Sequence, residues 1–214
     1  MKPGVTVVVL AAALVTAGAA WAEDPPSPEP AEETHATSSS DGMTGNVQFL
    51  IGQTYLGDFW KPLDEPAAFG IEVDFGPSKS IVHVAMAWSG SYDSGTVATP
   101  YFGRTGDVAV GFLEFSAGFL VHPVRKGPVR PYFGAGALRV FASTDSGANA
   151  WNGGDNDQSF GFYANAGIFF KVGDHFNIGF DGRIVRETKI LLVGVEGDAD
   201  YEQINMLIGF SWGK

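Results

Sequence analysis

Alternation between large apolar residues and small or polar residues runs through the chain from residue 46 to its end. It is clearest in the stretch Tyr201–Trp212, where the large apolar residues at alternate positions are Ile204, Met206, Ile208, Phe210 and Trp212. A period of two is the pattern of a β-strand that turns one face toward an apolar environment. The stretch therefore predicts a strand with one apolar face, and the environment of that face becomes the main question.

Seven further segments share this period, and no helical period competes with it beyond residue 22. They are Asn46–Leu56, Ala68–Phe75, Ile81–Ser89, Asp107–Val121, Arg130–Ala142, Ser159–Val172 and His175–Thr188. Three of the connections are short and rich in Gly, Pro or Asp, as turns are. The other four are longer: 57–67, 90–106, 143–158 and 189–200. Short turns at one end and long loops at the other predict an all-β fold, an eight-stranded antiparallel up-and-down transmembrane β-barrel.

The face opposite the apolar one carries charged residues near the middle of the predicted strands. They are Glu72, Asp74, Glu114, Arg139, Lys171, Asp181 and Arg183. Gly and Ala alternate with these charges, and such small residues are poor choices for a solvated strand surface. We interpret this face as the lining of a narrow lumen that is filled by side chains. Because an unpaired charge is unfavourable there, we expect Glu114 to pair with Arg139 and Asp181 to join Arg183 in the same network.

The apolar face is then expected to contact lipid, with aromatic residues near its ends. These residues are Tyr55, Trp88, Tyr132, Phe176 and Trp212. A soluble barrel with the two faces inverted, as in secreted ligand-binding proteins, is the alternative outside the membrane class.

The first 45 residues have a different character. Lys2 precedes an apolar run at positions 5–20, and Ala20-Trp21-Ala22 has the form of a cleavage site, so residues 1–22 are predicted to be a signal peptide cleaved after Ala22. Residues 23–45 are rich in Pro, Glu, Ser and Thr and nearly lack large apolar side chains, so we expect a disordered acidic leader. The barrel domain is predicted to span residues 46–214.

Composition narrows the choice of function. The chain has 13 basic and 24 acidic residues, a net charge of -11, which opposes binding to nucleic acid. Its mean hydropathy of +0.06 is compatible with membrane strands, because only half of the residues in such a strand face lipid. The absence of Cys excludes a disulfide framework and a lipoprotein attachment site.

Enzymatic chemistry is not expected. A hydrolytic site needs a His, a Ser and an acid that converge on one place. His122 and His175 fall in turns at one end of the predicted barrel. His83 points into the lumen near that end, where pairing with a carboxylate is the ordinary role of a histidine. The sequence also has no G-x-S-x-G element. Loop carboxylates such as Asp155 and Asp157 are too common in solvated loops to indicate a cation site. We therefore predict no enzyme activity, no metal and no cofactor.

Two motifs resemble a known family. The segment Arg130–Ala137 (RPYFGAGA) is similar to the R-P-Y-x-G-x-G-x strand start of bacterial outer-membrane β-barrel domain proteins, and Ile204–Trp212 resembles their C-terminal assembly signal, although Gly213 and Lys214 follow the terminal aromatic residue. The resemblance covers residues 46–214 and includes the OmpA-, OmpX- and OmpW-like eight-stranded barrels. It implies a place in the bacterial outer membrane, with outer-membrane lipid and the barrel assembly machinery as partners.

From these features we expect a structural or surface-interaction role, with a surface ligand reached through the four long loops. Three alternatives stay open. They are a small pore or OmpW-like channel for small or hydrophobic solutes, a lipid-modifying outer-membrane enzyme, and the secreted barrel with inverted faces.

Overall fold

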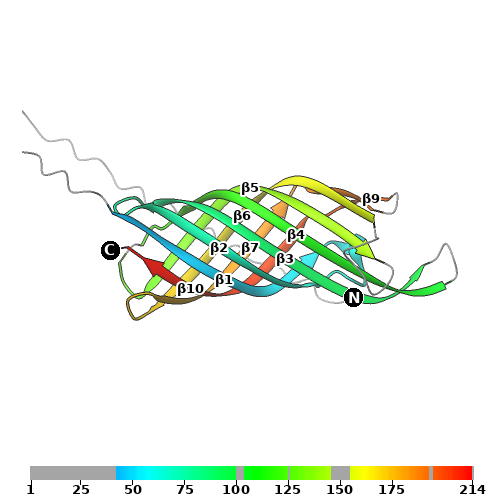
Figure 1. Ribbon diagram of the computed structural model, residues 1–214, viewed down its shortest axis with the longest axis horizontal. Coiled ribbons are helices and arrows are strands. Elements are labelled where there is room, and N and C mark those ends of the chain that lie inside the picture. The colour runs from blue at the N-terminus through cyan, green and yellow to red at the C-terminus, as the bar shows by residue number, and fades with distance from the viewer. Residues whose placement is uncertain (1–41, 100–103, 125, 146–154, 193–194, 214) are drawn as a thin grey trace, which may run out of the picture. The chain divides into compact units, whose positions relative to one another are not determined.

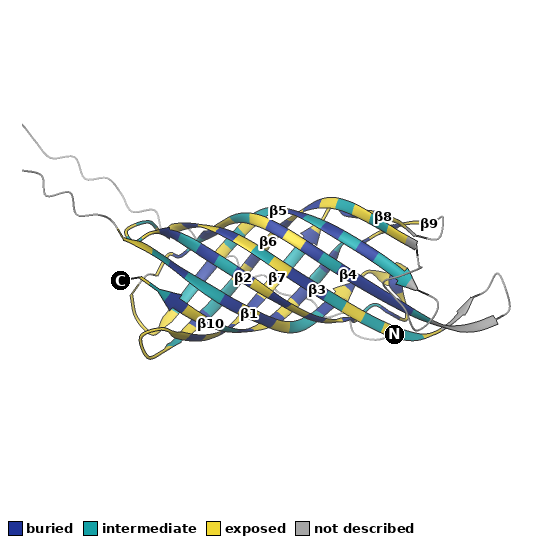
Figure 2. Cartoon of the chain, viewed as in Figure 1, coloured by how far each residue is buried: buried dark blue, intermediate teal, exposed yellow. Residues whose placement is uncertain are grey.

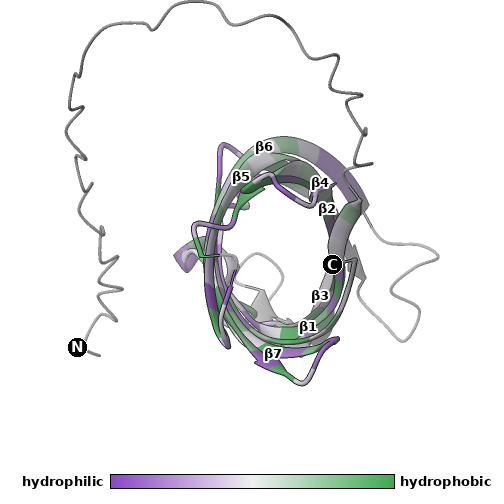
Figure 3. Ribbon diagram, turned by 90° about the vertical axis from the view of Figure 1, so that its left-hand side faces the viewer, coloured by the Kyte–Doolittle hydropathy of each residue, from purple (hydrophilic) through white to green (hydrophobic). Residues whose placement is uncertain are grey.

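Eight antiparallel strands close into a barrel in the order β1-β10-β7-β6-β5-β4-β3-β2 (Figures 1 and 3). The computed structural model describes residues 42–99, 104–124, 126–145, 155–192 and 195–213. The barrel strands are β1 (Met43–Leu56), β2 (Ala67–Pro77), β3 (Val82–Thr99), β4 (Arg104–Val121), β5 (Val129–Asp145), β6 (Asp155–Val172), β7 (Phe176–Arg186) and β10 (Tyr201–Trp212). The predicted eight-stranded antiparallel up-and-down topology is confirmed.

The barrel closes between its first and last strands. β10 pairs with β1 from Gly45 opposite Trp212 to Leu56 opposite Tyr201, and its other edge pairs with β7. A closed ladder leaves no strand with unpaired backbone groups, which is the condition for crossing hydrocarbon as a sheet. Tyr201–Trp212 is therefore the closing strand, as its pattern predicts.

Several strands are longer than their apolar alternation. β3 and β4 stay paired as far as Thr99 opposite Arg104, so most of the predicted loop 90–106 is strand, and β5 and β6 likewise extend into the predicted loop 143–158. These extensions are rich in Ser, Thr, Asp and Gly, and a strand beyond the hydrocarbon does not need an apolar face. β1 similarly begins at Met43, three residues before the predicted start. Residues 1–41, which hold the predicted signal peptide and most of the leader, lie outside the described residues.

The remaining long connections contain local structure. Loop 57–66 holds the 3-10 helix η1 (Asp58–Trp60), and the connection between β7 and β10 holds a separate hairpin of β8 (Lys189–Leu192) and β9 (Val195–Asp198). The long loops lie at one end of the barrel, which we call the loop end. The short turns, the start of β1 and the end of β10 lie at the other end, which we call the turn end (Figure 1). Among the described residues, no helix is long and apolar enough to span a membrane.

Exposed and buried residues alternate along the strands (Figure 2). On the outer face, Phe119 is 59% exposed and Phe160 is 69% exposed, although both are large and apolar. Outward aromatic and aliphatic residues of this kind recur on all eight barrel strands, while polar and charged residues are buried inside. This distribution matches a barrel whose outer face contacts lipid and not water.

The prediction was wrong for β5, where the two faces are exchanged. Tyr132 is 1% exposed and lies in the lumen with Leu138 and Val140, not in the lipid-facing aromatic belt. Arg139 lies on the outer face, where its guanidinium stacks 5.0 Å from the ring centroid of Phe141 and 5.1 Å from that of Phe160. The lumen near the loop end is apolar, so apolar alternation does not identify the lipid-facing side of this strand.

Candidate functional site

The middle of the lumen holds a buried ion pair. Arg183 on β7 lies 2.7 Å from Glu114 on β4, across the barrel, and each residue is 3% exposed. The guanidinium also lies 4.0 Å from the ring centroid of Tyr163. The partner of Glu114 is therefore Arg183, and the predicted pair with Arg139 does not form because Arg139 faces outward.

A second carboxylate in the middle of the lumen, that of Asp181, is held by uncharged hydrogen-bond donors. Asp181 accepts hydrogen bonds from the Tyr132 hydroxyl at 2.6 Å and from the Asn165 amide at 3.3 Å. Glu72 is also buried and interacts electrostatically with Asp181 and Arg183. Three carboxyl groups and one guanidinium, with two phenol rings, therefore fill the centre of the lumen.

Two glycines make room for one of these rings. A Cβ at Gly118 would lie 2.6 Å from the Tyr163 hydroxyl, and a Cβ at Gly136 would lie 2.7 Å from the Tyr163 ring. The glycines are neighbours on β4 and β5. The Tyr163 side chain thus lies along the inner wall over bare backbone of β5 and β4, which explains why these two positions of the lumen face are glycine.

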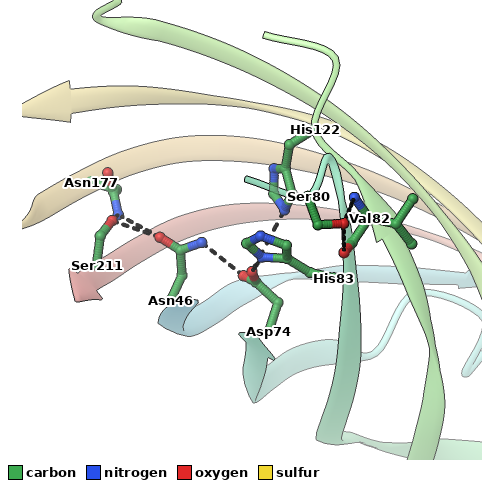
Figure 4. A network of polar contacts seen from close by, with 8 residues as sticks. All are labelled: Asn46, Asp74, Ser80, Val82, His83, His122, Asn177 and Ser211. Atoms are coloured by element: carbon green, nitrogen blue, oxygen red, sulfur yellow. Dashed lines mark hydrogen bonds and ion pairs between the residues drawn. The ribbon is translucent and has the colours of Figure 1, made fainter. Parts of the chain in front are cut away.

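The turn end of the lumen holds a cluster of one carboxylate and two imidazoles (Figure 4). Asp74 on β2 is fully buried, and its Oδ1 lies 2.7 Å from Nδ1 of His83 on β3 and 3.5 Å from Nε2 of His122, which directly follows β4. The two imidazole centroids are 4.7 Å apart. The three potential ligand atoms all lie within 4.8 Å of one another.

Hydrogen bonds from neighbouring strands fix the carboxylate, because Asn46 on β1 is the cross-strand partner of Asp74. The Asn46 amide donates to the second carboxylate oxygen, Oδ2, at 2.9 Å. The Asn46 carbonyl oxygen in turn accepts from the Ser211 hydroxyl at 2.6 Å and from the Asn177 amide at 3.3 Å (Figure 4). β1, β10 and β7 therefore position a carboxylate that β2 supplies.

A cavity of about 290 Å³ adjoins this cluster at the turn end. His83 and His122 line it, together with Arg130, Lys171 and His175. Lys171 donates to the backbone carbonyl of Asp174 at 2.9 Å, so it lies at the mouth of the barrel and not in the central charge network.

The loop end is closed by apolar packing. Trp60 of η1 is buried, stacks edge-on against Phe112 at 5.0 Å between ring centroids, and donates from its indole N–H to the Asp198 carbonyl at 2.8 Å. Leu63 joins the same apolar cluster, which continues down the lumen. At the surface, a hydrogen bond and the charge of Lys61 lower the pKa of Asp58.

The structure places the predicted lumen residues as follows. Inside the barrel lie Glu72, Asp74, Glu114, Asp181 and Arg183; at its mouth lies Lys171; on its outer face lies Arg139. The residues of the predicted C-terminal assembly signal face outward on β10. They are Ile204, Met206, Ile208, Phe210 and Trp212.

His122 is the site residue that the sequence interpretation missed. The sequence places it in a turn outside any site, whereas in the structure it is 8% exposed and contacts Asp74. The signal was present in the alternation, because every second residue of β4 from Phe112 to Leu120 points inward and His122 is the next residue of that series.

Comparison with known proteins agrees with this architecture. Residues 7–213 match the family model of the outer membrane protein beta-barrel domain. No curated protein matches the chain. Ail, the attachment invasion locus protein of Yersinia pestis, solved in complex with the heparin analogue sucrose octasulfate, is 14% identical, with a TM-score of 0.54 over 79% of this chain and 99% of that one.

Two further solved structures are similar. Neisserial surface protein A is 15% identical, with a TM-score of 0.49 over 79% of this chain and 95% of that one. The N-terminal β-barrel domain of Pseudomonas aeruginosa OprF is 12% identical, with a TM-score of 0.47 over 78% and 97% of the two chains. At these identities only the fold is shared. From the family match over nearly its whole length, the chain belongs to the outer membrane protein beta-barrel domain family and forms a transmembrane barrel of the bacterial outer membrane.

Proposed function

We propose that this protein is a non-conducting barrel that acts through its surface loops. The observation that carries the proposal is the filled lumen. Between the turn-end cavity and the loops, the interior is crossed first by the layer of Glu114, Arg183 and Tyr163 and then by the apolar packing under Trp60. A cavity lined by Glu114 of the first layer and by Phe112 and Val140 of the second measures about 10 Å³, which is room for about one water molecule.

The loops support an interaction role because they are tied together. Trp60 joins loop 57–66 to the β8–β9 hairpin through the Asp198 carbonyl, and Asp200 accepts hydrogen bonds from the backbone N–H and the hydroxyl of Thr188 at 2.9 and 3.0 Å. Leu191 donates to Asp157 at 2.6 Å, which fastens the hairpin to β6. A surface held in one arrangement loses less entropy when it binds a partner.

The charge of these loops restricts the partner. Segments 57–66 and 187–200 carry seven acidic residues and two lysines. Lys61 pairs with Asp58, and Lys189 lies 4.0 Å from Glu196. A polyanion such as the heparin analogue bound to Ail would be repelled, so the partner of this protein is expected to be neutral or cationic.

The positions of the histidines do not favour enzymatic action on outer-leaflet lipid. The histidines among the described residues, His83, His122 and His175, all lie at the turn end, which faces the periplasm in this architecture.

Planar-bilayer recordings test the closed lumen. We expect the folded protein to give no steady conductance under conditions where a porin gives large open channels. If a current does appear, two variants show whether it passes through the lumen. Arg183→Ala alters the layer of charges inside the lumen, whereas Arg139→Ala alters only the outer face. Steady wild-type channels would overturn the closed lumen and favour the small-pore alternative.

A loop-shortened variant tests the surface role. Replacing residues 57–66 and 187–199 by short turns is expected to abolish attachment of cells to their partner surface while the barrel still assembles. Unchanged attachment by cells that carry an assembled, loop-shortened barrel would contradict a role exerted through these loops.

A further inference from the structure

The cluster of Asp74, His83 and His122 is not used by the proposed function. It is remote from the loops, and it is the one group of three potential metal ligands among the residues that the structure describes. It draws on three adjacent parts of the barrel wall, because β2 pairs with β3 and β3 pairs with β4. The closed sheet therefore fixes the three side chains relative to one another.

The separations between the ligand atoms suit a small divalent ion. Bonds of about 2.0–2.1 Å in a tetrahedral arrangement place ligand atoms about 3.4 Å apart. The carboxylate oxygen of Asp74 lies 2.7 Å from His83 Nδ1 and 3.5 Å from His122 Nε2, so shifts of less than about 1 Å bring these donors to bonding positions. Two imidazoles and one carboxylate match Zn²⁺ and its neighbours in the first transition row, and they do not match Ca²⁺ or Mg²⁺, which prefer oxygen ligands alone.

Two observations distinguish the cluster from an ordinary His–Asp contact. His122 is 8% exposed, and its Nε2 forms no hydrogen bond of normal geometry although it points at Asp74. Two imidazole nitrogens thus converge on one carboxylate oxygen, while the other oxygen is held by Asn46 at 2.9 Å. An outer contact that orients a ligating carboxylate is a regular feature of protein metal sites.

The site is also accessible. The cavity of about 290 Å³ at the turn end is lined by both histidines, so an ion can enter from the periplasmic side and keep an open position for solvent or an anion. Arg130 and Lys171 line the same cavity and oppose a cation, whereas Asp174 and the buried Asp74 favour one. The positive rim would favour an anionic fourth ligand over a neutral one.

We propose that Asp74, His83 and His122 form a binding site for a divalent transition-metal ion, with Zn²⁺ as the best fit, at the periplasmic mouth of the barrel. The site does not depend on the proposed surface function or on whether the lumen conducts.

Metal titration of the folded barrel in detergent micelles tests the site. After treatment with a chelator, the protein is titrated with Zn²⁺ in competition with a chromophoric chelator, and saturation at one ion per chain is expected. His122→Gln is expected to weaken binding by about 100-fold or more, because even the loss of a contact outside the ligands typically costs about 10–100-fold. His175→Gln is the matched control, because His175 lines the same cavity outside the cluster, and it should leave the affinity unchanged.

Co²⁺ substitution of the wild-type protein gives a readout that needs no variant. The visible absorption of a four-coordinate Co²⁺ ion with nitrogen and oxygen ligands is expected, and Zn²⁺ should abolish it. Heat-modifiable gel mobility establishes that each variant is folded. Absence of the Co²⁺ spectrum, or Zn²⁺ binding that is equal in wild type and a folded His122→Gln variant, would overturn the proposal.

Discussion

Replacing Arg183 by Met tests whether the centre of the lumen is desolvated. Met has a similar length and no charge, so the change leaves Glu114 buried without its partner 2.7 Å away and removes the cation from the face of Tyr163. Two unit charges about 4 Å apart at an effective dielectric constant of about 20 interact by about 4 kcal/mol. Breaking a buried pair typically costs about 3–5 kcal/mol, and we expect a loss of unfolding free energy in this range.

Urea unfolding of the barrel in phospholipid vesicles, followed by tryptophan fluorescence and by unheated gel mobility, measures this loss. The double variant Glu114→Gln/Arg183→Met removes both charges and should recover about 2–3 kcal/mol relative to the sum of the single changes. Arg139→Met is the matched control, because the Arg139 guanidinium stacks on Phe141 and Phe160 on the outer face, and its loss should cost less than about 1 kcal/mol. Equal effects of the two arginine changes, or strict additivity in the double variant, would show that the central pair is solvated and that the lumen is not filled as described.

Three further predictions address the lipid face, the packing of the lumen and the loop end. Phe210→Asp places a charge on the outer face near the turn end and should reduce the free energy of folding into vesicles by up to about 2–4 kcal/mol, depending on depth, so a normal yield of the heat-modifiable form would place Phe210 away from lipid. Gly167→Val would set a Cβ about 2.4 Å from the Tyr132 ring, so we expect a loss of about 1–3 kcal/mol in the same urea assay, and no loss would mean that the ring is not held there. Trp60→Ala should free loop 57–66 from the β8–β9 hairpin and speed its cleavage by external protease with the barrel intact, whereas an unchanged cleavage rate would argue against the tryptophan as the anchor.

Strand number, topology and the faces of seven strands follow from the sequence because they depend on local period. In β10, for example, the alternation alone assigns each residue from Ile204 to Trp212 to a face, and the burial pattern agrees. Assigning alternate residues to opposite faces is reliable where one face must be apolar for contact with lipid and the other face carries charges. Under those conditions a shift of one residue would expose the charges to hydrocarbon.

The face of β5 could not be assigned in this way. Leu138 and Val140 are apolar because they join the buried cluster under Trp60, and Arg139 is tolerated outside because Phe141 and Phe160 cover its guanidinium. Both facts depend on neighbours that are distant in the chain. The correct partner of Glu114 is hidden for the same reason, since Arg183 reaches it across the lumen.

The sequence by itself determined that this chain forms a closed eight-stranded barrel with an apolar exterior, because the apolar period, the turn residues and the loop lengths are local properties of the chain. Only the tertiary structure decided which charges meet inside. Antiparallel pairing of β2 with β3 and of β3 with β4 gathers Asp74, His83 and His122 from positions up to 48 residues apart into one cluster. Spacing along the chain carries no record of that convergence, because it arises from strand register and from the curvature of the barrel wall.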